Sequence, residues 1–263
     1  MPFTALYDVQ LYWKRDGRDD APGLILLNSI GTDMDLWDAV LPMLRDHFAI
    51  LRVDTRGHGA STAYPGDWSL AQLAEDVLTA ANDAGLETFA IAGVSLGGMI
   101  AMETALRAPA RVTRLIPVCT SATMDSAAWA DRIAIIKAKG MSGIADLAMG
   151  RFLSDLAEPA IREAVRRQLL TMDPAGYCGC AAAIRDMKLI ERLPQIACPT
   201  LVVTGARDTS TPYEGHGEHL AAAIPGARHL ELDAGHLAPL EAPETLAAAL
   251  IPFVAGHDAS AAT

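Results

Sequence analysis

Ser95 is the centre of a short stretch whose residue types suit nucleophilic chemistry. It lies between Gly93 and Gly97 in the pattern Gly-x-Ser-x-Gly. An apolar run of strand type precedes this pattern, and residues 96–106 have helical spacing. A strand that turns directly into a helix needs small residues around the turn, and it presents the serine at the amino end of the helix. Because the helix dipole there favours negative charge, the stretch predicts a serine nucleophile that generates an oxyanion.

A serine hydroxyl also needs a base to take its proton, and the base needs a carboxylate to orient it. Asp208 follows the apolar run 200–204, and His236 follows the run 229–232. If both runs are parallel strands, each side chain comes just beyond a carboxyl end, where such sheets gather their ligands. We therefore predict Ser95 as nucleophile, His236 as base and Asp208 as orienting acid. A loop carboxylate and a surface histidine are the alternative interpretation of the last two.

The tetrahedral intermediate of acyl transfer needs two N–H donors for its oxygen. One predicted donor is the backbone N–H of Leu96, the residue after the nucleophile. The second is the backbone N–H of Ile30, in the loop that follows the apolar run 24–27. Another loop, at residues 54–61, contains His58 between two glycines. We interpret that loop as a tight turn held by polar contacts, and not as the source of a second base.

Strands and helices alternate along the chain, with one long interruption. Strands are predicted at residues 10–14, 24–27, 48–53, 90–94, 112–119, 200–204 and 229–232, and helices at 34–46, 70–84, 96–106, 213–223 and 243–254. The interruption contains no convincing strand but has helical spacing at 127–139, 159–172 and 177–190. Such alternation predicts a doubly wound, mostly parallel α/β sheet. We assign residues 1–120 and 195–263 to this core and 121–194 to an inserted helical lid.

Composition limits the classes of partner. The chain has 263 residues, 51% of them hydrophobic, which suits one large core with an insertion. Its net charge of −11 argues against nucleic acid or an anionic membrane as partner. The first residues do not resemble a signal peptide, and no apolar run approaches membrane-spanning length. We therefore expect a cytoplasmic monomer or small homo-oligomer that acts on a small molecule.

Neither the cysteines nor the histidines predict a metal centre. The cysteines have no paired Cys-x-x-C spacing, and in a cytosolic chain we expect reduced, mostly buried thiols at Cys119, Cys178, Cys180 and Cys198. His216 and His219 share one predicted helix face but have no carboxylate set nearby, so we predict no metal site. We also predict that the chemistry needs no cofactor.

The predicted lid differs in charge from the rest of the chain. It has ten basic and nine acidic side chains, whereas the remainder has a net charge of −12. A substrate carboxylate that loses its hydration needs a local cation, and Arg132, Arg151 and Arg185 of the lid are our candidates. Trp37, which follows the Ile30 loop, is the candidate for an apolar pocket wall. Solvated arginines and ordinary core packing of the tryptophan are the alternative interpretations.

The serine–acid–histidine order resembles that of the α/β-hydrolase superfamily, and several motifs are similar to those of its 3-oxoadipate enol-lactonase family. These motifs are Asn-Ser-Ile-Gly-Thr-Asp at 28–33 with Trp-Asp at 37–38, Asp-Thr-Arg-Gly-His-Gly-Ala-Ser at 54–61, the elbow at 93–99, and residues 173–177 leading into 183–187. The resemblance implies an α/β-hydrolase fold with its lid inserted after the sixth strand. It also implies cofactor-free hydrolysis of a carboxylate-bearing enol-lactone in the β-ketoadipate route of aromatic catabolism.

Two positions depart from that family. Arg151 stands where the family usually has a tryptophan, and residues 238–241 read Ala-Pro-Leu-Glu in place of a Ser-Asn pair before Val-Glu. A carboxylesterase or lactonase of different specificity therefore remains an alternative function. A lyase, a perhydrolase or a ligand-sensing protein would use the same residues. A haloalkane dehalogenase or epoxide hydrolase is disfavoured, because those enzymes need a carboxylate where Ser95 stands.

Overall fold

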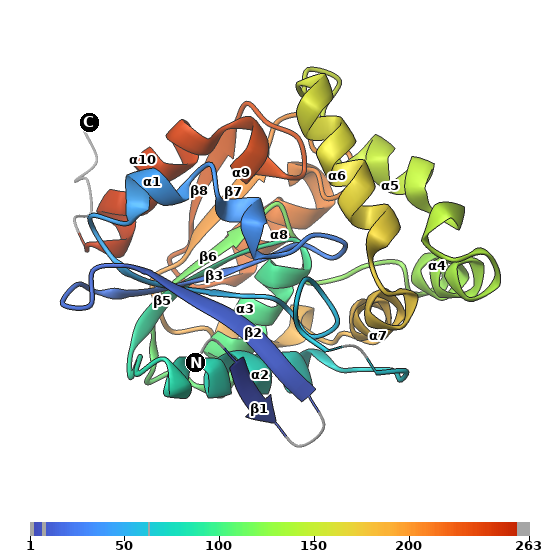
Figure 1. The fold of residues 1–263 in the computed structure, drawn as a ribbon. Helices are drawn as coiled ribbons and strands as arrows, with labels where there is room; N and C mark the ends of the chain where they lie inside the picture. Colours follow the sequence, from blue (N-terminus) through green and yellow to red (C-terminus); the bar gives the residue numbers. More distant parts are fainter. Residues whose placement is uncertain (1–2, 7–8, 63, 257–263) are drawn as a thin grey trace.

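An eight-stranded sheet forms the centre of the molecule (Figure 1). The computed structural model describes residues 3–6, 9–62 and 64–256. The strands lie in the order β1-β2-β4-β3-β5-β6-β7-β8. Their bounds are β1 (Phe3–Leu6), β2 (Val9–Gly17), β3 (Gly23–Leu27), β4 (Ala49–Val53), β5 (Phe89–Val94), β6 (Val112–Val118), β7 (Leu201–Gly205) and β8 (Arg228–Leu232). The pairs from β4 to β8 are parallel, whereas β1 and β2 run antiparallel at one edge.

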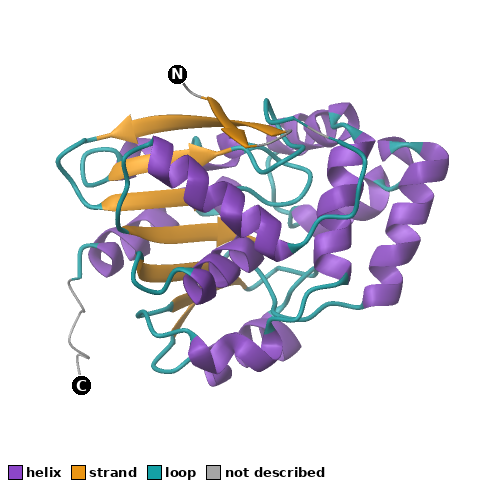
Figure 2. Ribbon diagram, turned by 90° about the horizontal axis from the view of Figure 1, so that it is seen from below, coloured by secondary structure: helices purple, strands orange, loops and turns teal. Residues whose placement is uncertain are grey.

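Helices cover both faces of this sheet (Figures 1 and 2). On one face lie α2 (Leu70–Asp83) and α3 (Leu96–Arg107), and on the other lie α1 (Leu41–Leu44), α9 (Ala238–Glu241) and α10 (Pro243–Val254). Every residue of β4, β5 and β7 is buried, which is the pattern expected of parallel strands enclosed on both sides. The core also contains the 3₁₀ helix η1 (Met34–Trp37). Its remaining elements are the kinked segment η4 (Tyr213–Gly217) and α8 (Glu218–Ala223).

A group of helices is inserted between β6 and β7, and it lies at one end of the sheet (Figures 1 and 2). Its members are α4 (Ser126–Lys139), η2 (Met141–Gly143), α5 (Ala145–Phe152), α6 (Pro159–Thr171), α7 (Pro174–Arg185) and η3 (Ile190–Gln195). The predicted insertion of a helical lid after the sixth strand is thereby confirmed. The predicted boundary at residue 194 falls inside η3.

The capping signals of the sequence account for several helix ends. The Ser69 side chain accepts from the Gln72 backbone N–H at 3.3 Å, and the Gln72 side chain accepts from the Ser69 backbone N–H at 3.0 Å. This reciprocal capping box starts α2 where the sequence predicts it. The last helix has the predicted bounds 243–254. The sequence also predicts a frayed tail at residues 256–263, of which residues 257–263 lie outside the described part of the chain.

Some predicted elements are wrong in extent. The predicted helix at 34–46 is two short pieces, η1 and α1, because Pro42 has no N–H to continue a single helix through this region. The predicted helix at 177–190 starts earlier, at Pro174, and ends at Arg185. The sequence patterns do not predict β1 or α5.

Two glycines allow the sharp turn between β5 and α3. A Cβ atom on Gly93 would lie 2.2 Å from the carbonyl carbon and oxygen of Gly97. A Cβ atom on Gly97 would lie 2.7 Å from the carbonyl oxygens of Leu27 and Asn28. All of these neighbours are backbone atoms, which cannot rotate away as a side chain can. The first turn of α3 can therefore lie against the loop after β3 only because both positions lack a side chain.

We expect Gly93→Ala to lower the free energy of unfolding by at least about 1–3 kcal/mol, the usual cost of overpacking. The matched control is Gly150→Ala in α5, where nothing lies within 4 Å of an added Cβ. That change should stabilise the protein by up to about 1 kcal/mol, because alanine favours helix over glycine. Urea unfolding followed by circular dichroism measures both values. Equal effects of the two substitutions would contradict the close-approach argument.

Candidate active site

Ser95 has a backbone conformation that side chains rarely adopt. Its φ is 55° and its ψ is −115°, and Cys119 is the other non-glycine residue with positive φ in the described part of the chain. Hydrogen bonds on both sides hold this conformation. The Ser95 N–H donates to the Val118 carbonyl at 2.9 Å, and its carbonyl accepts from Met99 N–H at 3.1 Å and from Thr120 Oγ1 at 2.6 Å. The surrounding structure thus fixes a strained residue at the turn, as expected of a functional site.

Asp208 and His236 form a buried pair. Asp208 Oδ2 lies 2.9 Å from His236 Nδ1, and the two residues are 4% and 1% exposed. The second carboxylate oxygen, Oδ1, accepts backbone N–H bonds from Ser210 at 2.7 Å and Thr211 at 3.0 Å. The Thr211 hydroxyl adds a donor to Oδ2 at 2.9 Å. The loop after β7 therefore supplies the acid and the donors that hold it.

The electrostatics of this pair fix its protonation. Burial by itself raises the pKa of Asp208, but the facing His236 and the N–H donors outweigh burial and lower that pKa to about 2. Asp208 is consequently a carboxylate at any ordinary pH, and it can only accept. His236 Nδ1 must then carry the proton of this hydrogen bond, which leaves Nε2 as the basic nitrogen.

The loop that carries His236 contacts the chain segment that holds Ser95. Cys119 Sγ lies 3.7 Å from the carbonyl oxygen of Gly235, the residue before His236. Cys119 directly follows Val118, whose carbonyl holds the Ser95 N–H. The three predicted triad residues thus follow the carboxyl ends of β5, β7 and β8, at one edge of the sheet. Among the hydrogen bonds of the described residues, none joins Ser95 Oγ to His236.

The backbone N–H groups of Ile30 and Leu96 have no acceptor among the described residues. Leu96 is the first residue of α3, so no preceding turn provides an acceptor for it. In the parallel pairing of β3 with β5, Leu27 lies opposite Gly93. Ile30 follows Leu27 by three residues and Leu96 follows Gly93 by three residues, so both segments begin from the same level of the sheet. These are the donors that the sequence predicts for the oxyanion.

A turn holds the Ile30 segment in shape. Thr32 N–H donates to the Ser29 carbonyl at 3.2 Å, with Ile30 and Gly31 between them. The Asn28 side-chain amide donates to the carbonyls of Ser29 at 2.9 Å and Thr32 at 2.6 Å. We call residues 28–32, which contain the predicted donor Ile30, the oxyanion loop. Its polar groups are satisfied mainly by the loop itself, which favours a rigid segment.

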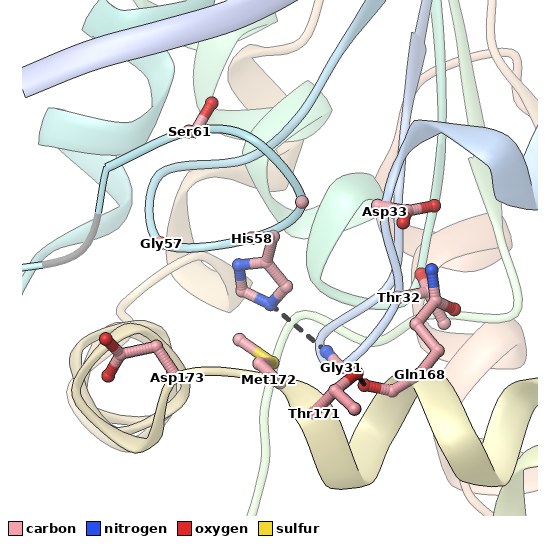
Figure 3. A pocket seen from close by; sticks show the side chains of 11 residues that line it. Gly31, Thr32, Asp33, Gly57, His58, Ser61, Gln168, Thr171, Met172 and Asp173 are labelled. Carbon is pink, nitrogen blue, oxygen red and sulfur yellow. Dashed lines mark hydrogen bonds between the residues drawn. The ribbon is translucent and has the colours of Figure 1, made fainter.

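A cavity of about 500 Å³ borders the oxyanion loop (Figure 3). Its walls come from the oxyanion loop, from the turn at residues 57–61, and from the end of α6 with the start of α7. The lining residues are Gly31, Thr32, Asp33, Gly57, His58, Gly59, Ser61, Gln168, Thr171, Met172 and Asp173. The cavity therefore lies where the lid meets the core. Ser95 itself is only 7% exposed.

Arg132 is bound within the lid. Its Nη1 atom donates to the Tyr177 hydroxyl at 3.2 Å, and its guanidinium lies 4.4 Å from the Trp129 ring centroid. Tyr177 is fully buried, and a Cβ on Gly31 would lie 3.4 Å from its ring. Burial raises the pKa of Tyr177, so its hydroxyl stays protonated. Arg132 thus connects, through Tyr177, to the edge of the oxyanion loop.

The other predicted substrate-binding residues lie elsewhere. Arg185 is paired with Asp67 at 2.8 Å and with Asp186 at 2.5 Å near the surface. Arg151 is exposed. Trp37 is fully buried, and its indole N–H donates to the Leu27 carbonyl at 3.1 Å. The structure does not bring these three side chains together with Arg132, and Trp37 has the packing of a core residue.

Several side chains around the predicted triad were not recognised from the sequence. Phe152 of α5 stacks on His236 with centroids 6.2 Å apart, and its carbonyl accepts from Leu237 N–H at 3.0 Å. Tyr177 stands inside a motif, but no pattern shows that it faces the oxyanion loop. Thr211 follows Asp208 by three residues, a spacing that favours a local turn bond and was the available signal.

Glu241 joins the lid to the histidine loop. Its Oε1 atom accepts from Ser154 N–H at 2.9 Å, and its Oε2 accepts from Ser154 Oγ at 2.5 Å. The same Oε2 accepts from Gly235 N–H at 3.2 Å. Ser154 follows α5, and Gly235 precedes His236. One carboxylate therefore connects the end of α5 with the loop that carries the predicted base.

We expect Glu241→Ala to lower the free energy of unfolding by about 2–4 kcal/mol, because it leaves donors at Ser154 and Gly235 without an acceptor. Glu241→Gln keeps one carbonyl oxygen and should lose less. The control is Glu244→Ala on the exposed start of α10, with a change of no more than about 0.5 kcal/mol. Denaturant unfolding of the four proteins makes the comparison. If the alanine variants at 241 and 244 were equally stable, the carboxylate would not join the two loops.

The comparisons with known proteins agree with this architecture. A model of the alpha/beta hydrolase fold matches residues 22–243. The enzyme 3-oxoadipate enol-lactonase 2 of Acinetobacter baylyi is 30% identical over 90% of each chain. The crystal structure of the enol-lactonase of Burkholderia xenovorans superposes with a TM-score of 0.93 at 31% identity, covering 97% of this chain and 100% of that one. A hydrolase of Pseudomonas aeruginosa gives a TM-score of 0.90 at 41% identity, covering 95% and 97%.

The chain therefore belongs to the α/β-hydrolase family and is a hydrolase. Among its relatives are 3-oxoadipate enol-lactonases, which the motifs of the sequence resemble. Within the described residues, no helix is long and apolar enough to cross a membrane. In the same part of the chain, no group of three or more His, Cys, Asp or Glu side chains is placed to hold a metal ion.

Proposed function

We propose that this protein is a serine hydrolase that cleaves an ester or lactone through an acyl-enzyme. The observation that carries the proposal is the 2.9 Å bond between Asp208 and His236 Nδ1, which leaves Nε2 basic in the loop beside Ser95. We assign residues 121–194 as the lid and the remainder as the catalytic core. The expected setting is cytoplasmic, without metal or cofactor, as a monomer or small homo-oligomer.

The geometry supports the following order of steps. Ser95 Oγ attacks the substrate carbonyl carbon as His236 Nε2 takes the hydroxyl proton. The carbonyl oxygen becomes an oxyanion, which accepts from the N–H groups of Ile30 and Leu96. The imidazolium, stabilised by Asp208, returns the proton to the leaving oxygen as the carbon–oxygen bond breaks. In a lactone the leaving oxygen remains attached to the acyl group.

Deacylation reverses these roles. Water attacks the acyl carbon while His236 Nε2 takes one of its protons, and the same two N–H groups hold the second oxyanion. The bond to Ser95 Oγ then breaks, and the imidazolium protonates that oxygen. The product is the free carboxylic acid, which ionises by releasing its proton to water, and the enzyme is unchanged. No oxidant, reductant or second substrate besides water is required.

Replacing Ser95 by alanine tests the nucleophile. We expect a loss of kcat by several orders of magnitude on p-nitrophenyl acetate, because the triad acts as a unit. The fold should persist, since alanine is small enough for the turn. Circular dichroism and the melting temperature provide the control for folding. Retention of even a tenth of the wild-type kcat would show that another group is the nucleophile.

For the substrate we propose a carboxylate-bearing enol-lactone of the 3-oxoadipate type. Similarity to the enol-lactonases over nearly the whole chain supports this class. The pair of Arg132 and Tyr177 supports it physically, because a guanidinium and a protonated hydroxyl at the edge of the oxyanion loop suit an anion. A carboxylesterase or lactonase of other specificity is the alternative, favoured by the positions of Arg151 and Arg185 outside this region.

Charge recognition is tested with Arg132→Met. We expect a loss of about 1.5–3 kcal/mol in transition-state binding for the carboxylate-bearing lactone, the value of a charged hydrogen bond. The methyl ester of the same lactone should be slowed little. The matched control is Arg185→Met, because its surface pairs with Asp67 and Asp186 are worth less than about 1 kcal/mol. Measurements of kcat/KM for both substrates decide the question.

Equal slowing of the acid and its methyl ester by Arg132→Met would mean that the arginine supports the lid without recognising charge. No slowing of either substrate would remove Arg132 from the site. In both cases the serine hydrolase assignment would stand, and the preferred substrate would be a neutral ester.

A further inference from the structure

His58 is a buried histidine whose two ring nitrogens are both engaged by the backbone. Its Nε2 lies 3.1 Å from the Gly31 N–H, and its Nδ1 lies 3.1 Å from the Arg56 carbonyl oxygen (Figure 3). A carbonyl only accepts, and an amide N–H only donates. The ring must therefore carry its proton on Nδ1 and accept at Nε2. His58 is 2% exposed, so water does not compete for either bond.

This arrangement excludes His58 as a general base. A base needs a free lone pair that faces the proton to be taken. The Nε2 lone pair of His58 points at Gly31, and Nδ1 carries a proton bound to Arg56. Burial also lowers the pKa of His58 to about 4, so the ring stays neutral. The hydrogen bond from Gly31 requires a neutral ring, because a protonated Nε2 would place its own N–H against the Gly31 N–H.

The residue that His58 binds occupies a critical position in the oxyanion loop. Gly31 has a φ of +83°, and it is the third residue of the turn that the Thr32 N–H closes onto Ser29. Glycine with φ near +80° at that position is typical of a type II turn. A type II turn differs from type I by a flip of its central peptide, which here joins Ile30 to Gly31. The Gly31 N–H belongs to that peptide, so its acceptor selects one of the two turns.

Within the loop itself this peptide has one long hydrogen bond, 3.5 Å from Ser29 Oγ to the Ile30 carbonyl oxygen. The Asn28 side chain binds the carbonyls of Ser29 and Thr32, which are the two ends of the turn. Only His58, from the turn at residues 57–61, provides an acceptor for the Gly31 N–H among the described residues. The central peptide immediately follows Ile30, whose own N–H is the proposed oxyanion donor.

We propose that His58 is a positioning residue of the oxyanion hole, acting through Gly31 on the conformation of Ile30. This inference rests on the proposed function, because it assigns Ile30 to the hydrolytic site. The Gly-His-Gly turn thereby has a role beyond the structural one that its sequence predicts. His58 does not touch the reacting atoms; it fixes the turn that presents one of the two donors.

The experiment compares His58→Gln with His58→Phe. Glutamine can place an acceptor near the position of Nε2, whereas phenylalanine fills the space without one. On p-nitrophenyl acetate we expect His58→Phe to lose about 10- to 100-fold in kcat with a KM within about threefold, since a displaced donor costs less than a deleted one. His58→Gln should recover most of that loss. The exposed His219→Gln is the control and should match wild type.

A second measurement separates positioning from general stability. Phenylboronic acid binds serine hydrolases as a tetrahedral adduct, so its affinity reports on the oxyanion hole without turnover. It should weaken in His58→Phe by the same factor as kcat, at a temperature where melting curves show every variant folded. Full kcat and boronate affinity in folded His58→Phe would overturn the proposal. A loss that glutamine does not restore would also overturn the hydrogen-bond account.

The tautomer is tested directly in the unmodified protein. Nitrogen-15 spectra of histidine-labelled wild type, with His58→Gln for assignment, should show a His58 ring protonated at Nδ1 and unchanged from pH 5 to 8. Protonation at Nε2, or titration in that range, would overturn the proposal. If wild type hydrolysed no ester, the proposed function would fail, and the spectra and boronate binding would still decide the role of His58. An acid limb of kcat/KM that disappeared in His58→Gln would identify His58 as the base instead.

Discussion

The close approach of α3 to the loop after β3 is the constraint on which the site depends. At Gly97 this approach leaves no room for a Cβ against the carbonyls of Leu27 and Asn28. The parallel pairing of β3 with β5 sets the level from which both loops start. Three features then follow together: the strained Ser95, the unpaired N–H of Leu96, and the unpaired N–H of Ile30. A looser turn would separate the proposed nucleophile from its proposed oxyanion donors.

Three buried ionisable side chains near this approach have pKa values that shift in different directions. Burial raises the pKa of Asp54 to about 6 even though its oxygens accept from Met34 and Ala60 N–H, both at 2.8 Å. At Asp208, similar N–H donors and the facing His236 reverse the effect and lower the pKa to about 2. At His58, burial lowers the pKa with no facing carboxylate to oppose it. Burial therefore favours the neutral form of each group, and the partners that a group faces decide whether that preference is reversed, as at Asp208.

Local patterns in the sequence were sufficient for the features that depend on neighbouring residues. The elbow glycines, the Ser69 capping box and the strands before Asp208 and His236 are all visible in short stretches. The sequence was less informative where distant segments decide. The antiparallel β1 is a four-residue edge strand without a strong pattern of its own. The predicted helix at 34–46 fails for a local reason, because Pro42 interrupts it. Cys119, Cys178 and Cys180 are buried, as expected, whereas Cys198 is only partly buried.

The lid shows why net charge is a weak guide to a binding site. Its arginines looked equivalent in the sequence, but their side chains meet different partners. Arg185 is neutralised by two adjacent carboxylates, whereas Arg132 contacts a buried phenol and an indole. An arginine already paired with carboxylates would have to lose those partners to bind a substrate anion, and that exchange gains little. An arginine bound to a neutral hydroxyl keeps its charge available. The identity of the partner, which sequence spacing cannot give, therefore makes Arg132 the better candidate.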